Sequence, residues 1–324
     1  MKRLIITESE KKHILGLYEG SVNGVTYRCP TEDAEIYNNL VNNIYPTQLN
    51  IAIKWWEEWL KSPITKDKFI QYNPGIQDPN KIFEGYFNIL KNIKIVPYGY
   101  CTNLKSDESY AYVTKSSSSI IYVNATYNKL DTQSIAEIFV HEVQHLLYFY
   151  QPLNPNIKIE DCFTAKTYVK GGVFQKIKNL FNTTKRQTNK TINNISSVLQ
   201  IPVESAQKIH KYITEQIEIE KNLGRENYIS NMNENSSRIM GIRQKLNIKP
   251  GVNITKEQFI PYFNNLINSQ TPDKYFTELL KTDSNFYFLI LYWGYKGFND
   301  IDSLLSGLNS LAYQKNKSNY ENVA

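Results

Sequence analysis

The chain has 324 residues, of which 41% are hydrophobic, so it can bury a sizeable core and exceeds what one small domain needs. Its net charge of +6 is concentrated in residues 162–203, which carry seven Lys or Arg side chains and no Asp or Glu. Three widely spaced cysteines, Cys29, Cys101 and Cys162, argue against a disulfide framework and against a thiolate zinc site.

The first 22 residues are predicted to form an N-terminal helix. Thr7 and Glu10 have the spacing of a capping box, and Gly20 follows a short apolar stripe. The apolar run after the first basic residues is too short for the core of a signal peptide, which favours a cytoplasmic location.

Helices and strands are then expected to alternate up to residue 124. The pattern predicts helices over 31–43, 50–60 and 81–90, and strands over 93–96, 110–114 and 120–124. The second of these helices carries Trp55, Trp56 and Trp59, which are expected in the core or at an anchor between domains.

The most informative stretch, His141-Glu142-Val143-Gln144-His145, lies in a segment with helical character that opens at Asp131. On a helix, residues four positions apart share a face, so His141 and His145 can point at one ion. Glu142 lies beside them, where it can polarise a water molecule. This spacing is typical of zinc hydrolases.

The basic segment follows this helix. An amphipathic helix is expected from Gly171 to Phe181, and a polar loop over 183–197. Such a segment can bind an anionic surface, such as a membrane or an acidic polymer, or it can be a helix that covers the cleft and exposes its lysines to water.

A catalytic zinc usually has three protein ligands, so the motif needs a third. We favour Glu234, which lies at the start of a helix predicted over 233–246, where the helix dipole favours a carboxylate. Arg238, one turn later, could orient Glu234 as a partner outside the ligand shell. His210 is the competing ligand or an oxyanion-stabilising residue, and Tyr228 could also assist. The weaker candidates are Glu215, Glu218 and Glu220.

The remaining elements are predicted to be helical. Helices are expected over 203–223 and 259–267 and onward to Ala312, with a capping box at Thr255 and Gln258. Residues 286–293 form the longest apolar run, but a membrane span needs about 20 apolar residues, so we expect a buried core segment and no transmembrane helix.

These elements predict a predominantly helical α+β fold. A small mixed sheet and the helix with the histidine motif would form a catalytic core, with helices added at both ends. We expect an N-terminal helix (1–22), a domain that carries the histidine motif (23–250) with a basic insertion (162–203), and a C-terminal helical region (251–324).

The order of strand, H-E-x-x-H helix and later Glu-bearing helix, over residues 110 to 245, resembles the zincin metallopeptidases and specifically the gluzincin branch. The resemblance implies a zinc-dependent peptidase that cleaves a peptide or protein substrate. His141, His145 and Glu234 would hold Zn²⁺, and Glu142 would act as the general base. The sequence departs from that branch at Arg238, because its members often show an Asp after the Glu.

A second resemblance concerns the source of the chain. Its opening, residues 4–19, and the segment from Tyr228 to Arg243 are similar to uncharacterised proteins of large tailed bacteriophages. This resemblance implies a phage-encoded protein, with other virion proteins as further partners. It also leaves an alternative open, in which the chain is a structural component of the capsid, neck, tail or baseplate with no essential catalysis.

Overall fold

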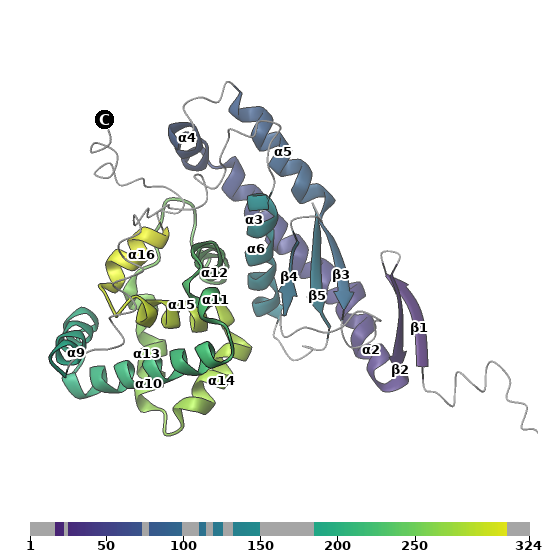
Figure 1. Ribbon diagram of the computed structural model, residues 1–324. Helices are drawn as coiled ribbons and strands as arrows, with labels where there is room; N and C mark the ends of the chain where they lie inside the picture. Colours follow the sequence, from purple (N-terminus) through teal and green to yellow (C-terminus); the bar gives the residue numbers. More distant parts are fainter. Residues whose placement is uncertain are drawn as a thin grey trace, which may run out of the picture. The chain divides into compact units, whose positions relative to one another are not determined.

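The computed structural model describes residues 17–22, 25–72, 78–98, 110–114, 119–125, 132–149 and 185–309 (Figure 1). The chain divides into two compact units, the first formed by Met1–Glu58 and Asn80–Tyr150 and the second by Trp59–Pro79 and Gln151–Ala324. The predicted domain boundaries at residues 22 and 250 stay predictions, because a division into compact units does not test them.

The first unit combines a hairpin, a small mixed sheet and helices. Its strands are β1 (Leu17–Val22), β2 (Val25–Pro30), β3 (Lys94–Tyr98), β4 (Ala111–Tyr112) and β5 (Ile120–Asn124). Its helices are α2 (Thr31–Asn39), the π-helical turn η1 (Leu40–Ile44), α3 (Tyr45–Lys61, which ends in the second unit), α5 (Pro79–Asn92) and α6 (Thr132–Phe149).

The three-stranded sheet has the order β3-β5-β4, with β3 parallel and β4 antiparallel to β5. Its central strand is rich in β-branched residues, and Ile121 and Val123 on it are fully buried. The helix α6 packs against β4 and β5 (Figure 1). Because Ser134 to Leu147 are buried at every position except Ile138, α6 is a core helix of this unit.

The second unit is helical. Its helices are α4 (Pro63–Tyr72), α9 (Lys185–Leu199), α10 (Val203–Asn222), α11 (Glu226–Ser230), α12 (Met232–Lys245), the short 3₁₀ helix η2 (Lys256–Gln258), α13 (Ile260–Asn268), α14 (Pro272–Thr282), α15 (Ser284–Tyr295) and α16 (Ile301–Asn309). The apolar run of α15 is buried from Asn285 to Tyr295 and packs against α10, α11, α12 and α14. The prediction of a buried core segment at 286–293 is therefore confirmed.

Most elements that the sequence predicts are present. The described part of the chain is predominantly helical with a small mixed sheet, so the α+β class is confirmed, and β5 has the predicted bounds. The tryptophans Trp55, Trp56 and Trp59 are buried. The capping box at Thr255 and Gln258 is also present, with the Gln258 side chain accepting from the Thr255 amide at 2.9 Å.

The predicted N-terminal helix is wrong at its C-terminal end, because Leu17–Val22 forms β1 and pairs antiparallel with β2. Asn23 and Gly24 separate the two strands in the sequence, and an Asn-Gly pair is the combination that favours hairpins over helix ends. Residues 1–16 lie outside the described residues.

The predicted loop at 183–197 is also wrong, because Lys185–Leu199 forms α9. Its Asn and Thr residues are weak helix formers, but Ile192, Ile195 and Leu199 recur on one face and are buried. Burial of this face outweighs the low propensity. The amphipathic helix expected at 171–181 and the cap at Asp131 fall outside the described residues.

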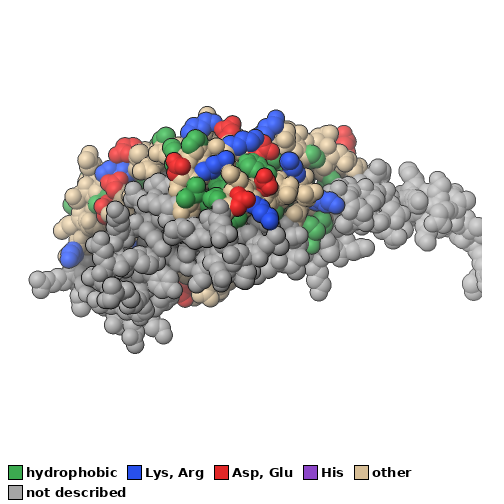
Figure 2. All heavy atoms as spheres, turned by 90° about the horizontal axis from the view of Figure 1, so that it is seen from above, with side chains coloured by type: hydrophobic (Ala, Val, Ile, Leu, Met, Phe, Trp, Pro, Cys, Tyr) green, Lys and Arg blue, Asp and Glu red, His purple; other side chains and the backbone are tan. Residues whose placement is uncertain are grey.

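One face of the molecule carries charged side chains of both signs. In Figure 2, Lys, Arg, Asp and Glu side chains intermingle over the described part of that face. The predicted anionic-surface site at 162–203 stays a prediction, because the description of this segment begins only at Lys185. None of the described helices is both long enough and apolar enough to span a membrane.

Candidate metal centre

The helix α6 carries the two histidines and is held in the core of the first unit by contacts with α3. Phe139, Val140 and Val143 are fully buried, and the ring of Tyr45 on α3 meets Phe139 edge-on at 6.1 Å. The indole Nε1 of Trp56 donates to the Val140 carbonyl at 3.0 Å. The residue just before the first histidine is therefore held by a side chain 84 positions earlier in the sequence.

The two imidazoles face each other as the spacing predicts. His141 and His145 lie one helical turn apart, with 4.9 Å between ring centroids and 3.1 Å between their Nε2 atoms. Two nitrogens bound at 2.0–2.1 Å to one tetrahedral zinc ion would lie about 3.3 Å apart. The separation of the Nε2 atoms therefore fits a pair of ligands to one cation. Both residues are buried.

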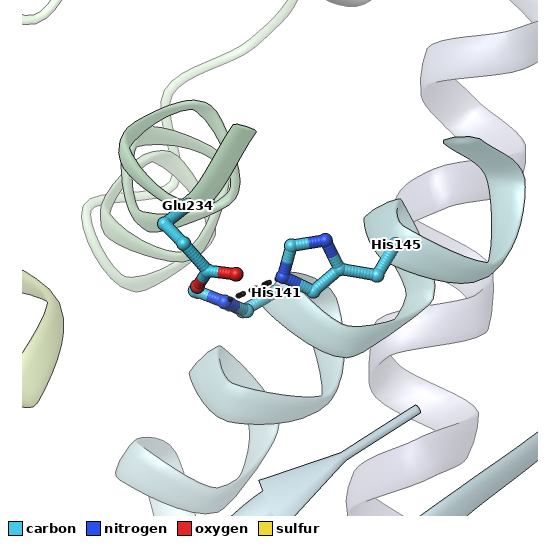
Figure 3. Close-up of side chains that lie close together, drawn as sticks. All are labelled: His141, His145 and Glu234. Atoms are coloured by element: carbon cyan, nitrogen blue, oxygen red, sulfur yellow. Dashed lines mark hydrogen bonds between the residues drawn. The ribbon is translucent and has the colours of Figure 1, made fainter. Parts of the chain in front are cut away.

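Glu234 completes a group of three metal-binding side chains (Figure 3). It belongs to the first turn of α12, and its ligand atom and those of His141 and His145 all lie within 4.8 Å of one another. Glu234 is half-buried and the histidines are buried. Two imidazoles and one carboxylate form a ligand set used by catalytic zinc, which keeps one further position open. This buried group could hold a metal ion.

Glu142 follows the first histidine and is 7% exposed. Its low exposure gives the carboxylate a drier environment than bulk water, where electrostatic interactions are stronger. Its predicted role as a general base stays a prediction.

Arg238 and Tyr228 lie at the corner between α11 and α12. The Arg238 guanidinium donates to the Tyr228 carbonyl at 3.0 Å and to the Asn235 side-chain oxygen at 2.6 Å. It also lies over the Tyr228 ring, 4.4 Å from the centroid. Arg238 is also fully buried, so its side chain is fixed close to the turn that carries Glu234. Its predicted pairing with Glu234 stays a prediction.

His210 lies on α10 within the helical unit. Its ring packs at 5.1 Å from the Phe298 ring, and burial lowers the pKa of the imidazole. His210 does not belong to the group formed by His141, His145 and Glu234 among the described residues. Of the two competing third ligands, the structure brings Glu234 to the histidines.

The sequence does not predict the contacts of two residues in this region. Its pattern predicts only that Trp56 packs in the core or at an anchor between domains, and it indicates no role for Asn235. The contact of Trp56 with Val140 has no local sequence pattern, because the two residues are far apart in the chain. The run of polar residues after Glu234, Asn235 to Arg238, is the one sequence feature that could have indicated a buried network.

The candidate metal centre is described by the geometry of its own residues. Comparison with protein families, with curated proteins and with solved structures found no match. The site is a cluster of two buried imidazoles and one half-buried carboxylate, which could hold a metal ion.

Proposed function

We propose that this protein is a zinc-dependent metallopeptidase, in which His141, His145 and Glu234 hold the ion. The observation that carries the proposal is the convergence of these three ligand atoms to within 4.8 Å of one another. Imidazole and carboxylate ligands suit zinc, and the 3.1 Å between the Nε2 atoms is close to the separation expected in a tetrahedral site. When bound, zinc supplies Lewis-acid chemistry that polarises a carbonyl and acidifies water.

Glu142 is the general base in this proposal. It directly follows a ligand on α6, so its carboxylate comes from the same helix as the two imidazoles. Glu142 takes a proton from the attacking water and then gives it to the leaving amine of the cleaved peptide bond. The low exposure of Glu142 favours these transfers because little bulk water competes for the proton.

The fold proposed for this core is zincin-like. A small mixed sheet with an antiparallel edge strand, β4, packs against the helix with the H-E-x-x-H motif, and this arrangement supports the proposal. We further propose that the protein is phage-encoded, on the resemblance of residues 4–19 and 228–243 to phage proteins.

A Glu142→Gln variant tests the proposed reaction. The amide cannot accept the proton, so we expect zinc binding to persist and cleavage to fall by about 100-fold or more. Cleavage would be measured with fluorescence-quenched casein and with a mixed peptide library, beside zinc content. The matched control is Glu84→Gln, the same change at an exposed position of the first unit.

Three outcomes distinguish the alternatives. Loss of cleavage only in Glu142→Gln supports the assignment, and equal cleavage by Glu142→Gln and the wild type contradicts it. A zinc-loaded wild-type protein that cleaves neither substrate would favour the structural virion component over the peptidase.

A further inference from the structure

The corner between α11 and α12 is held by one side-chain amide. α11 ends at Ser230, and Asn231 is extended before α12 begins. The last carbonyls of a helix lack partners within that helix. The Asn235 Nδ2 atom donates to the carbonyls of Ile229 and Asn231, each at 2.9 Å. Asn235 therefore ties the end of α11 to the first turn of α12.

Arg238 extends this network by one turn. It donates to the Asn235 oxygen at 2.6 Å and to the Tyr228 carbonyl at 3.0 Å, so it joins the amide to a second carbonyl of α11. Its guanidinium also lies over the rings of Tyr228 and Phe288, at 4.4 and 4.7 Å from their centroids. The amide of Asn235 is thus held at both of its polar ends.

The network is buried to an unusual degree for polar side chains. Asn235 and Arg238 are fully buried, and so are Ser236 and Ser237 between them. Burying polar groups costs free energy unless each finds a partner, so an apolar turn would pack at lower cost. Both polar atoms of the Asn235 amide are hydrogen-bonded, whereas Arg238 Nε and Ser237 Oγ have no hydrogen-bond partner among the described residues. A buried amide that is bonded at both atoms specifies one geometry. Glu234 directly precedes Asn235 in the sequence, in the same first turn of α12.

We propose that Asn235, supported by Arg238, is a positioning residue that sets the place of Glu234 for metal binding. The inference rests on the proposed function, because it gives Glu234 the role of a ligand. The fixed corner leaves the backbone of Glu234 little freedom, so less conformational entropy is lost when its carboxylate binds an ion. Residues that orient metal ligands typically change metal affinity by 10–100-fold when replaced.

The test is the zinc affinity of an Asn235→Leu variant, measured by competition with a chromogenic chelator on the full chain. Leucine has a similar size and cannot donate. We expect about 10–100-fold weaker zinc binding, at unchanged helical content of the metal-free protein. The matched control is Asn194→Leu, which removes another amide that donates to a backbone carbonyl, that of Phe298 at 2.8 Å. Its zinc affinity should stay within about twofold of the wild type, because Asn194 is on α9 and not beside a ligand.

A second variant covers the case in which Asn235→Leu does not fold. In Asn235→Ser the hydroxyl can still donate to the carbonyl four residues earlier, that of Asn231, but loses the bond to Ile229. We expect an intermediate loss of affinity. Wild-type zinc affinity in a folded Asn235→Leu or Asn235→Ser protein, or an equal loss in Asn194→Leu, would overturn this inference and leave the proposed function standing. A wild-type protein that binds no zinc would instead overturn the proposed function.

Discussion

Trp56 shows how a single side chain can hold the backbone beside the candidate metal centre without belonging to that group. Its indole N–H donates to the carbonyl of Val140, the residue before His141. In Trp56→Phe the ring is kept in part and this donor is lost. We expect a loss of about 1 kcal/mol in the free energy of unfolding, measured by urea denaturation of the metal-free protein. An unchanged unfolding midpoint would show that the hydrogen bond contributes nothing.

His210 gives a pH dependence that does not involve the three candidate ligands. Burial lowers the pKa of this imidazole below its ordinary value of 6.5, so the unfolded chain binds a proton more readily than the folded chain. The contribution of His210 to stability is therefore present above about pH 6.5 and is lost as the pH falls toward the lowered pKa.

The measurement is thermal unfolding of the metal-free protein between pH 7.5 and pH 5, for the wild type and His210→Gln. We expect the wild type to lose more stability than the variant over this range. The difference should be small, because the ring is only partly buried. Parallel curves for the two proteins would contradict the assignment.

The three candidate ligands could be predicted from the sequence, whereas the contacts of the residues around them could not. The spacing of His141 and His145 on one helix is a local pattern, and Glu234 is predicted from its place in the first turn of a helix. Asn235 could not be assigned in the same way. Its role depends on carbonyls at the end of the preceding helix, and only the folded corner brings them within reach of its amide.

At the scale of elements, the close approach of α10 and α15 depends on Gly294. A Cβ atom at this position would lie 2.5 Å from Ile213 Cγ2 and 2.9 Å from Ile217 Cδ1. We therefore expect Gly294→Ala to cost about 1–3 kcal/mol of stability through overpacking. Urea denaturation would measure the change in the free energy of unfolding.

The double variant Gly294→Ala with Ile213→Leu tests the cause of that loss. Leucine has no Cγ2 branch at Cβ, so the nearest methyl group is removed and part of the stability should return. Simple additivity of the two single changes, with no recovery in the double variant, would contradict an origin in this contact.

The elements that could not be predicted share a physical reason. β1 forms because β2 pairs with it along its length, and α9 forms because its apolar face is buried. Both depend on partners outside the segment. By contrast, the β-branched run of β5 and the apolar run of α15 contain enough local information to predict the element or its burial.

At the scale of the whole molecule, the predicted fold class holds and the chemistry is concentrated in a small set of residues. The described chain is predominantly helical, with one small mixed sheet and a separate hairpin. Two helices far apart in the sequence, α6 and α12, supply the three candidate ligands. The central claim is therefore that these helices carry one zinc site.

Zinc content of the purified full chain tests this claim most directly, for the wild type, Glu234→Ala and Glu204→Ala. Glu204 is the matched control, since it is an exposed glutamate in the first turn of another helix, α10. We expect about one zinc per chain in the wild type and in Glu204→Ala, and a large loss in Glu234→Ala, because a catalytic zinc needs three protein ligands. A wild type that stays free of zinc after zinc is offered, or a Glu234→Ala protein that keeps it at wild-type affinity, would contradict the three-ligand site.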